Sequence, residues 1–199
     1  DSTYRYTMTD NLQPLPLHSA HARKPEGEPK ADKPQYFMLT HGSHLIDMTR
    51  FLAGPLTRVR ARRKEIFGAY SWFVEVEFAS GAQGHLDLTI AVRMDYFEGF
   101  QIYGEHGSAV GKIYLPWFLK SADVECFSTR DAQYHRPLGA DAHFYRRQLE
   151  AFADTVLTNV RQVGTTAKDG LAAMQAMVAT NRSVESGDWV ALEDASGSV

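Results

Sequence analysis

The residues best suited to chemistry lie on one predicted helix, within residues 36–55. Thr40, His44 and Asp47 follow each other at spacings of four and three residues, which places a hydroxyl, an imidazole and a carboxylate along one edge of a helix. A neutral imidazole can exchange a proton with a substrate hydroxyl, and a neighbouring carboxylate can fix its tautomer. His44 is therefore the best candidate for a catalytic group. From the spacing alone, a surface or half-buried histidine with an ordinary helical neighbour is the favoured interpretation.

His41 lies within the apolar stripe of the same helix. That position favours a packed, hydrogen-bonded core histidine over a histidine that contacts substrate. His41 and His44 also have a spacing that could bind a metal, but no cysteine cluster or His-Glu motif supplies a third ligand. We therefore expect no metal site.

The central helix that carries these residues should end at Gly54 and Pro55. Glycine suits the left-handed residue after the last helical turn, and proline cannot continue a helix. The apolar residues of the helix share a stripe roughly 100° wide, which is wide enough to be buried. They are Phe37, Met38, Leu45, Met48 and Leu52.

Strand-like segments follow the central helix. The basic run over residues 58–64 alternates with apolar residues, which is typical of a strand near an edge or against solvent. Residues 70–78 alternate strongly, with Trp72, Val74, Val76 and Phe78 on one face. They should pair with residues 85–93 as an antiparallel hairpin around a Ser-Gly turn. Further strands are expected over residues 96–103, 109–115 and 119–127.

The two ends of the chain differ in character. Residues 1–8 alternate like a strand, and residues 9–35 form a proline-rich irregular excursion that is either a functional flap or a disordered linker. Near the other end, a helix with apolar 4-3-4 spacing should follow a cap at Asp141. A second helix should start at a capping box at Thr166, and a short strand should follow around residues 189–192. The expected buried stripes are Tyr145, Leu149, Phe152 and Val156 on the first helix, and Leu171, Met174 and Val178 on the second.

This order of elements predicts an α+β fold. One open, mainly antiparallel sheet would carry helices on one face, and residues 1–199 would form a single domain. The opposite face would mix aromatic and charged side chains, which is typical of a subunit interface and predicts a homodimer or homotetramer. The residues of that face are Phe73, Glu75, Glu77, His85, Asp87, Thr89 and Arg93.

Composition excludes several classes of protein. The net charge of −3 does not favour binding to nucleic acid or to a membrane surface. No apolar run reaches the roughly 18 residues of a membrane span, and no signal-peptide pattern is present. Cys126 is the single cysteine, so a reducing cytoplasm is expected. Because the chain starts with Asp and leads directly into a strand-like pattern, we expect it to be part of a longer protein.

A glycine-rich segment over residues 104–111 invites comparison with phosphate-binding loops. Such loops connect a strand to a helix, so that the helix N-terminus meets the phosphate. This segment lies between two predicted strands, and an ordinary turn between strands is the favoured interpretation.

From the central helix onwards, the chain resembles the C-terminal domain of the Gfo/Idh/MocA (glucose–fructose oxidoreductase/inositol dehydrogenase) family. Its helix resembles the family pattern Asp-x-x-x-His-x-x-Asp followed by Leu-x-Gly. The resemblance covers nearly the whole chain apart from residues 9–35. It rests on the ordered segments LTHGSHLIDMTRFLAG, FASGAQGHLDLTI, YGEHGSAVGKIYL, FYRRQLEAFADTV and TTAKDGLAAMQAMVATNRSVESGDWVAL.

The resemblance implies a two-domain oxidoreductase that uses NAD or NADP on a sugar, cyclitol or related polyol. An N-terminal Rossmann domain would bind the cofactor and carry a catalytic lysine in a Glu-Lys-Pro motif. Neither that motif nor Gly-x-Gly-x-x-Gly occurs in this chain. The chain would then be the substrate and oligomerisation domain alone, with no cofactor-binding residues and no activity by itself.

The same resemblance implies roles for single residues. His44 matches the catalytic histidine, while Thr40 stands where many members have an acid. A threonine can hydrogen-bond a substrate but cannot act as a base near neutral pH. Asp47 matches a position that orients the helix, and Thr40, His41 and Asp47 are the candidate substrate contacts. The alternative is a non-catalytic assembly or binding module that keeps the fold.

Overall fold

The computed structural model describes residues 32–92, 97–114, 122–138, 144–160 and 164–192. The chain divides into two compact units, one of residues 23–93 and 164–199 and the other of residues 1–22 and 94–163. Each unit is described by itself. The strand expected over residues 1–8, the cap expected at Asp141 and most of the excursion expected over residues 9–35 lie outside the described residues.

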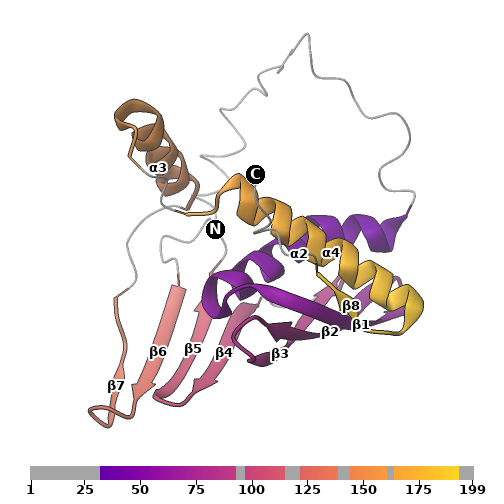
Figure 1. The fold of residues 1–199 in the computed structure, drawn as a ribbon, viewed down its shortest axis with the longest axis horizontal. Coiled ribbons are helices and arrows are strands. Elements are labelled where there is room, and N and C mark those ends of the chain that lie inside the picture. Colours follow the sequence, from indigo (N-terminus) through magenta and orange to yellow (C-terminus); the bar gives the residue numbers. More distant parts are fainter. Residues whose placement is uncertain (1–31, 93–96, 115–121, 139–143, 161–163, 193–199) are drawn as a thin grey trace, which may run out of the picture. The chain divides into compact units, whose positions relative to one another are not determined.

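The unit that contains the candidate site is a sheet covered by two helices on one face (Figure 1). The helices are packed against each other, and the first lies against β3 while the second lies against β1. All strand pairs are antiparallel, in the order β3-β2-β1-β8. The elements are α2 (Lys33–Ala53), β1 (Leu56–Ile66), β2 (Ala69–Phe78), β3 (Gln83–Ile90), α4 (Ala167–Ser186) and β8 (Val190–Ala191).

Helix α2 begins earlier than the sequence pattern predicted. The side chain of Asp32 accepts a hydrogen bond from the backbone N–H of Gln35 at 3.0 Å and so caps the helix. Pro34 falls in the first turn, where a missing N–H costs nothing. The last residues assigned to the irregular excursion are therefore helical. The helix ends before Gly54, as predicted, and Gly54 has a φ of +92°.

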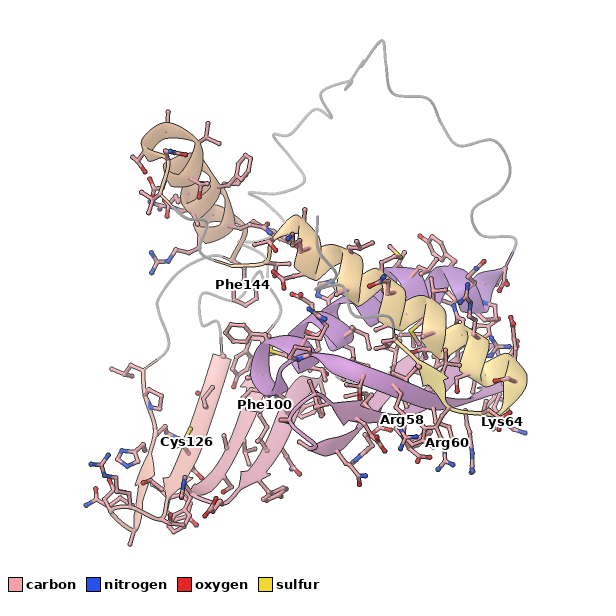
Figure 2. The ribbon with its side chains drawn as sticks, in the orientation of Figure 1. Arg58, Arg60, Lys64, Phe100, Cys126 and Phe144 are labelled. Atoms are coloured by element: carbon pink, nitrogen blue, oxygen red, sulfur yellow. The ribbon has the colours of Figure 1, made fainter. Side chains whose placement is uncertain are left out.

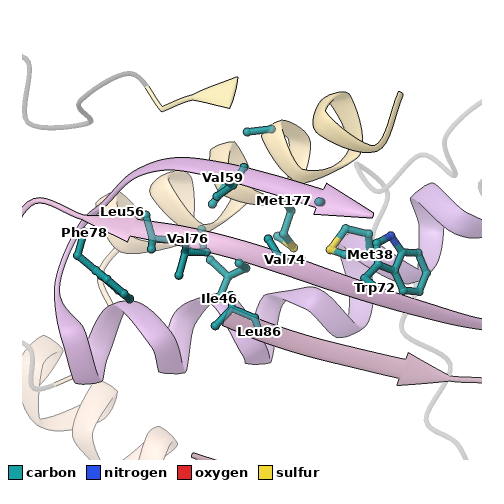
Figure 3. Close-up of a cluster of buried hydrophobic side chains, with 14 of the residues drawn as sticks. Met38, Ile46, Leu56, Val59, Trp72, Val74, Val76, Phe78, Leu86 and Met177 are labelled. Carbon is teal, nitrogen blue, oxygen red and sulfur yellow. The ribbon is translucent and has the colours of Figure 1, made fainter. Parts of the chain in front are cut away.

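The core of this unit forms along β2 and confirms the predicted hairpin. The side chains of Trp72, Val74 and Val76 are at most 1% exposed, and β2 pairs with β3 across the turn at residues 80–81. Figure 3 shows these side chains meeting others from α2 and α4. The first part of strand β1 does not form an edge of the sheet, because β8 pairs with its residues Arg58 and Val59. The alternation of β1 and β2 therefore locates the core correctly.

The buried face of α2 differs from the predicted stripe. Met38, Gly42 and Ile46 are the buried residues of this helix, and they recur every fourth position. Gly42 has no side chain and faces α4, where an added Cβ would lie 3.5 Å from the Sδ atom of Met177. The buried face of the helix is therefore centred on Gly42. His41 lies outside that face and is exposed, so the expected packing of His41 in the core was wrong.

Helix α4 buries small residues instead of the predicted stripe, so that prediction was wrong. Leu171 and Met174 are 57% and 43% exposed. Small side chains allow a helix backbone to approach its neighbours closely, and the spacing between helices depends on the residues at the contact. The buried residues are Ala172, Ala173, Ala176, Met177, Ala179, Thr180 and Ser183.

Ser183 shows how closely α4 approaches the sheet. Its hydroxyl accepts a hydrogen bond from the backbone N–H of Ala61 at 2.8 Å and donates one to the carbonyl oxygen of Asp188 at 2.6 Å. Strand β8 is too short to reach Ala61, because it pairs only with Arg58 and Val59. The serine therefore satisfies a buried N–H of β1 that the short strand leaves unpaired.

Two glycine substitutions test this close packing. Gly42→Leu is expected to lower the free energy of unfolding by about 1–3 kcal/mol, because the added bulk meets Met38 and Met177. Gly170→Ala in α4 should raise it by about 0.5–1 kcal/mol, since a Cβ there has no neighbour within 4 Å and alanine favours the helix. Urea unfolding followed by circular dichroism measures both. An unchanged midpoint for Gly42→Leu would contradict the close contact.

The second unit also has a four-stranded antiparallel sheet, in the order β4-β5-β6-β7. Helix α3 has the predicted apolar stripe, but its four residues are between 57% and 68% exposed. The short strand β7 has no counterpart in the sequence prediction. The elements are β4 (Glu98–Gly104), β5 (Gly107–Ile113), β6 (Ala122–Ser128), β7 (Gln133–His135) and α3 (Phe144–Thr158).

The α+β class is therefore confirmed. The described strands form two antiparallel sheets and not the one broad sheet that was expected. No helix within the described ranges is both long and apolar enough to cross a bilayer.

Candidate functional site

The candidate catalytic edge lies on the side of α2 that faces away from the sheet. Thr40, His41 and His44 are exposed, and Asp47 is half-buried. The hydroxyl of Thr40 donates to the carbonyl oxygen of Tyr36 at 2.8 Å, so its lone pairs remain able to accept a hydrogen bond. No hydrogen bond to the His44 ring is present within the described part of the chain. The structure thus places an accessible imidazole one helical turn after a hydroxyl.

Asp47 has a different partner from the one the sequence suggested. Its Oδ2 atom accepts a hydrogen bond from the hydroxyl of Thr165 at 3.1 Å, across 118 positions of sequence. The helical spacing predicted that a carboxylate would fix the tautomer of His44, but this bond directs Asp47 towards the start of α4. Asp47 therefore ties the two helices together, which agrees with the orienting role implied by the resemblance.

A second link between the helices lies beside this one. The guanidinium of Arg50 is 3.5 Å from Asp169, and Asp169 completes the predicted capping box with Thr166. The hydroxyl and then the backbone N–H of Thr166, together with Arg50, lower the pKa of Asp169 below its usual value. Ionised Asp169 is also favoured at the positive end of α4. The capping box was predictable from the sequence. The role of Thr165 was not, because its only local signal is its position next to that box.

Apolar side chains are exposed on the same helix layer as His44. Phe51 on α2 is 83% exposed, and Leu171 and Met174 on α4 are 57% and 43% exposed. Contacts from Arg50 to Asp169 and from Gly42 to Met177 show that the helices run antiparallel. Met174 and Leu171 consequently lie level with the middle and later turns of α2. Exposed apolar residues grouped in this way are typical of a surface that another part of a protein covers.

The opposite face of the sheet is polar and carries ordered ion pairs. The guanidinium of Arg58 donates to both carboxylate oxygens of Glu77 at 2.7 and 2.6 Å, and Arg60 binds Glu75 in the same two-point manner. These hydrogen bonds lower the pKa values of both glutamates. Both arginines point away from the helices, as Figure 2 shows. The first two arginines of the basic run on β1 are thus neutralised across the strands.

Two further side chains belong to this polar face. The ring of Trp189 lies 4.6 Å from the guanidinium carbon of Arg58 and 5.2 Å from that of Arg60, within cation–π range. Phe73 is 60% exposed directly opposite Arg62. The sequence analysis included Phe73 in this face but missed Trp189, which was expected only as part of a last strand. Arg93, another predicted member, lies outside the described residues.

The glycine-rich segment does not form a nucleotide loop. Gly104 pairs with Gly107 at a tight turn between β4 and β5, as the sequence analysis favoured. A Cβ at Gly107 would lie 1.9 Å from the carbonyl oxygen of Phe127, so packing against β6 explains the glycine. This segment therefore lacks the strand-to-helix connection of a dinucleotide-binding loop. Within the same ranges, no three His, Cys, Asp or Glu side chains are grouped to hold a metal ion.

Several solved structures share this fold. A protein from Desulfitobacterium hafniense named as an NADPH-dependent oxidoreductase superposes with a TM-score of 0.68 at 20% identity, covering 83% of this chain and 50% of that one. Levoglucosan dehydrogenase in complex with NADH and L-sorbose gives 0.62 at 17% identity, covering 80% and 52%. The WlbA dehydrogenase from Bordetella pertussis, in complex with NADH and UDP-GlcNAcA, gives 0.55 at 15% identity, covering 79% and 45%.

These identities show a shared fold, and the chain spans about half the length of the structures it matches. No curated protein matches the chain in sequence. The model of the oxidoreductase family's C-terminal alpha/beta domain matches residues 29–192. Because this match spans most of the chain and agrees with the observed fold, the chain belongs to the Gfo/Idh/MocA oxidoreductase family and represents its C-terminal α/β domain.

Proposed function

We propose that this chain is the substrate-binding and oligomerisation domain of an NAD(P)-dependent oxidoreductase that acts on a sugar, cyclitol or related polyol. His44 moves the proton of the substrate hydroxyl, and Thr40, His41 and Asp47 are the neighbouring candidate contacts. The observation that carries the proposal is the exposed imidazole of His44 on the outward face of α2. Family membership and the carbohydrate ligands of levoglucosan dehydrogenase and WlbA support the substrate class.

The side chains around His44 define how it can work. An imidazole can take up a proton from a hydroxyl and release it again near neutral pH. Thr40 cannot serve as a second base, so it would accept a hydrogen bond from the substrate and orient it. Asp47 acts through the helix, because its bond to Thr165 holds α2 and α4 together. His44 would therefore act without the usual acid one turn before it.

The nicotinamide cofactor, NAD or NADP, would be held by another part of the intact protein. When bound, it accepts a hydride from the substrate carbon. The apolar residues Phe51, Leu171 and Met174 are exposed on the helix layer that carries His44, which suits a surface covered by that part. The cover would also exclude water from the imidazole.

Cofactor binding separates the roles of the two halves. The chain of residues 1–199 is expected to show no saturable binding of NAD or NADP at micromolar concentrations, whereas the intact protein should bind one of them. Isothermal titration calorimetry of both proteins measures the difference. Saturable binding by the isolated chain would overturn the assignment of the cofactor to another part.

The polar face of the sheet is the proposed subunit interface of a homodimer or homotetramer. In a twofold arrangement, the row of arginines on β1 of one copy would face the row of glutamates on β2 of the other. Phe73 supplies an exposed aromatic anchor. The single cysteine, Cys126, suits a cytoplasmic protein.

A charge placed at Phe73 tests this interface. Phe73→Glu adds a third acid beside Glu75 and Glu77 and removes the anchor, so the oligomer of the intact protein should dissociate at micromolar concentration. Size-exclusion chromatography with light scattering measures the mass. Phe67→Glu, at the exposed tip of the β1–β2 hairpin, is the matched control and should keep the oligomer. A monomeric wild type, or an unchanged mass for Phe73→Glu, would contradict the assignment.

The second candidate function is a non-catalytic assembly or binding module. The threonine at position 40 favours it, because a member that lacks the acid can keep the fold and lose the reaction. The two candidates differ in one measurement, the turnover of a polyol by the intact protein with NAD or NADP.

A further inference from the structure

A polar cavity of about 260 Å³ lies at the end of the helix pair where α2 begins and α4 ends. These two helix ends lie together in Figure 1, as the antiparallel packing of α2 and α4 requires. All six lining residues belong to the same compact unit. They are Asp32 and Gln35 from the start of α2, Arg63 from β1, and Asn181, Val184 and Glu185 from the end of α4.

This cavity is separate from the candidate catalytic edge. Gln35 precedes His44 by nine residues of helix, which corresponds to roughly 13 Å along the axis. Neither His44 nor Thr40, His41 or Asp47 lines the cavity. A ligand bound there would contact the first turn of one helix and the last turns of the other, at the end remote from the Asp47–Thr165 bond.

Asn181 carries an unmet hydrogen-bonding requirement at this site. Its Oδ1 atom is shielded from solvent and accepts no hydrogen bond within the described part of the chain. A buried amide atom without a partner costs about 1–3 kcal/mol. The terminal torsion of asparagine is broad, so the amide can turn and present either its oxygen or its nitrogen to the cavity. A ligand group that both donates and accepts hydrogen bonds can pair with whichever atom of the amide faces the cavity.

The remaining side chains narrow the class of ligand. Asp32 and Glu185 offer acceptors, Arg63 offers donors only, and the amide of Gln35 offers both. The two carboxylates outnumber Arg63 and would repel an anion, whereas a cation placed among all three charges would meet both attraction and repulsion. Neutral hydroxyl groups can donate to the carboxylates and accept from the guanidinium. The volume lies just below the roughly 300 Å³ at which ordinary ligand pockets begin, which suits a molecule the size of one monosaccharide.

We propose that the cavity between the start of α2 and the end of α4 is a second binding site, distinct from the His44 edge, for a small neutral polyol. The site depends only on the fold of this unit, and it stands whether or not the protein is a dehydrogenase. A bound polyol links α2, β1 and α4 through hydrogen bonds to Gln35, Arg63 and Asn181.

Titration of the intact protein with D-sorbitol and myo-inositol tests the site, with D-glucosamine and D-gluconate as charged comparators. Calorimetry and ligand-observed NMR should detect millimolar binding of at least one polyol. Asn181→Leu, which keeps the branching and the number of heavy atoms of the side chain, and Arg63→Ala should each weaken that binding by about tenfold or more. Arg182→Ala, on α4 but outside the cavity lining, is the control and should leave it unchanged.

Circular dichroism separates a lost site from a lost fold. A folded Asn181→Leu variant with wild-type polyol affinity would overturn the proposal. Preferential binding of either charged comparator, or binding of neither polyol, would overturn it as well. The His44→Ala variant distinguishes this site from the proposed enzyme. Binding that depends on Asn181 should persist in it even where turnover is lost, and disappearance of that binding in folded His44→Ala would show that the two sites are one.

Discussion

Replacing His44 with alanine in the intact protein is expected to lower kcat for polyol oxidation by about 10²–10⁴, the scale of general acid–base catalysis. The imidazole is exposed on α2 and is the group on that edge best able to move a hydroxyl proton near neutral pH. Because Thr40 cannot act as a base, the loss should not be rescued from the neighbouring turn. Steady-state absorbance of the reduced nicotinamide measures the rate.

The control for this prediction removes another exposed imidazole. His106 lies at the turn between β4 and β5, away from the central helix in sequence, and His106→Ala should leave kcat within a factor of two. Circular dichroism should show that both variants fold as the wild type does. An unchanged rate in His44→Ala would remove this residue from the mechanism and favour the non-catalytic module.

The largest expected effect on stability comes from Trp72. Its side chain is 0% exposed and stacks on Tyr70 with ring centroids 6.0 Å apart. Truncation to alanine leaves a cavity beneath α2 and should lower the free energy of unfolding by about 3–5 kcal/mol. Trp72→Phe should cost less, because it keeps an aromatic ring and removes an indole N–H that has no partner among the described residues. Urea unfolding gives both values.

The matched control is Phe67→Ala, at the hairpin tip where the side chain is fully exposed. It should change the free energy of unfolding by no more than about 0.5 kcal/mol, since the phenyl ring buries no surface there. If Trp72→Ala were as stable as Phe67→Ala, the core could not be centred on β2.

The proposed second site has a consequence for how the helix pair is held. Asp47, Thr165, Arg50 and Asp169 join α2 and α4 at one end, and the polar cavity is lined by both helices at the other. A polyol bound in the cavity would therefore add a second connection between the two helices. Its effect on the stability of this unit would be linked to ligand concentration, as for any ligand that binds only the folded state.

Much of the fold could be predicted from local patterns. The alternation of β2 follows from the two-residue period of a strand, so the sequence correctly identified Trp72, Val74 and Val76 as core residues. The capping box at Thr166 was also predictable, because its bonds join residues three positions apart. The candidate edge on α2 is likewise a local feature. The helical spacing of Thr40, His44 and Asp47 follows from the sequence alone, while their roles remain predictions.

The tertiary structure decided which helix faces are buried and which partners the polar residues have. Hydrophobicity predicted a stripe of large residues on α4, but the helix packs through alanine and serine, because close backbone approach requires small side chains. On α2, Gly42 likewise allows the backbone to approach α4 closely, and the buried face centred on this glycine does not include His41. The bonds from Asp47 to Thr165 and from Ala61 to Ser183 join residues more than 100 positions apart. No local pattern contains such pairs, since they form only when the packed helices bring distant residues together.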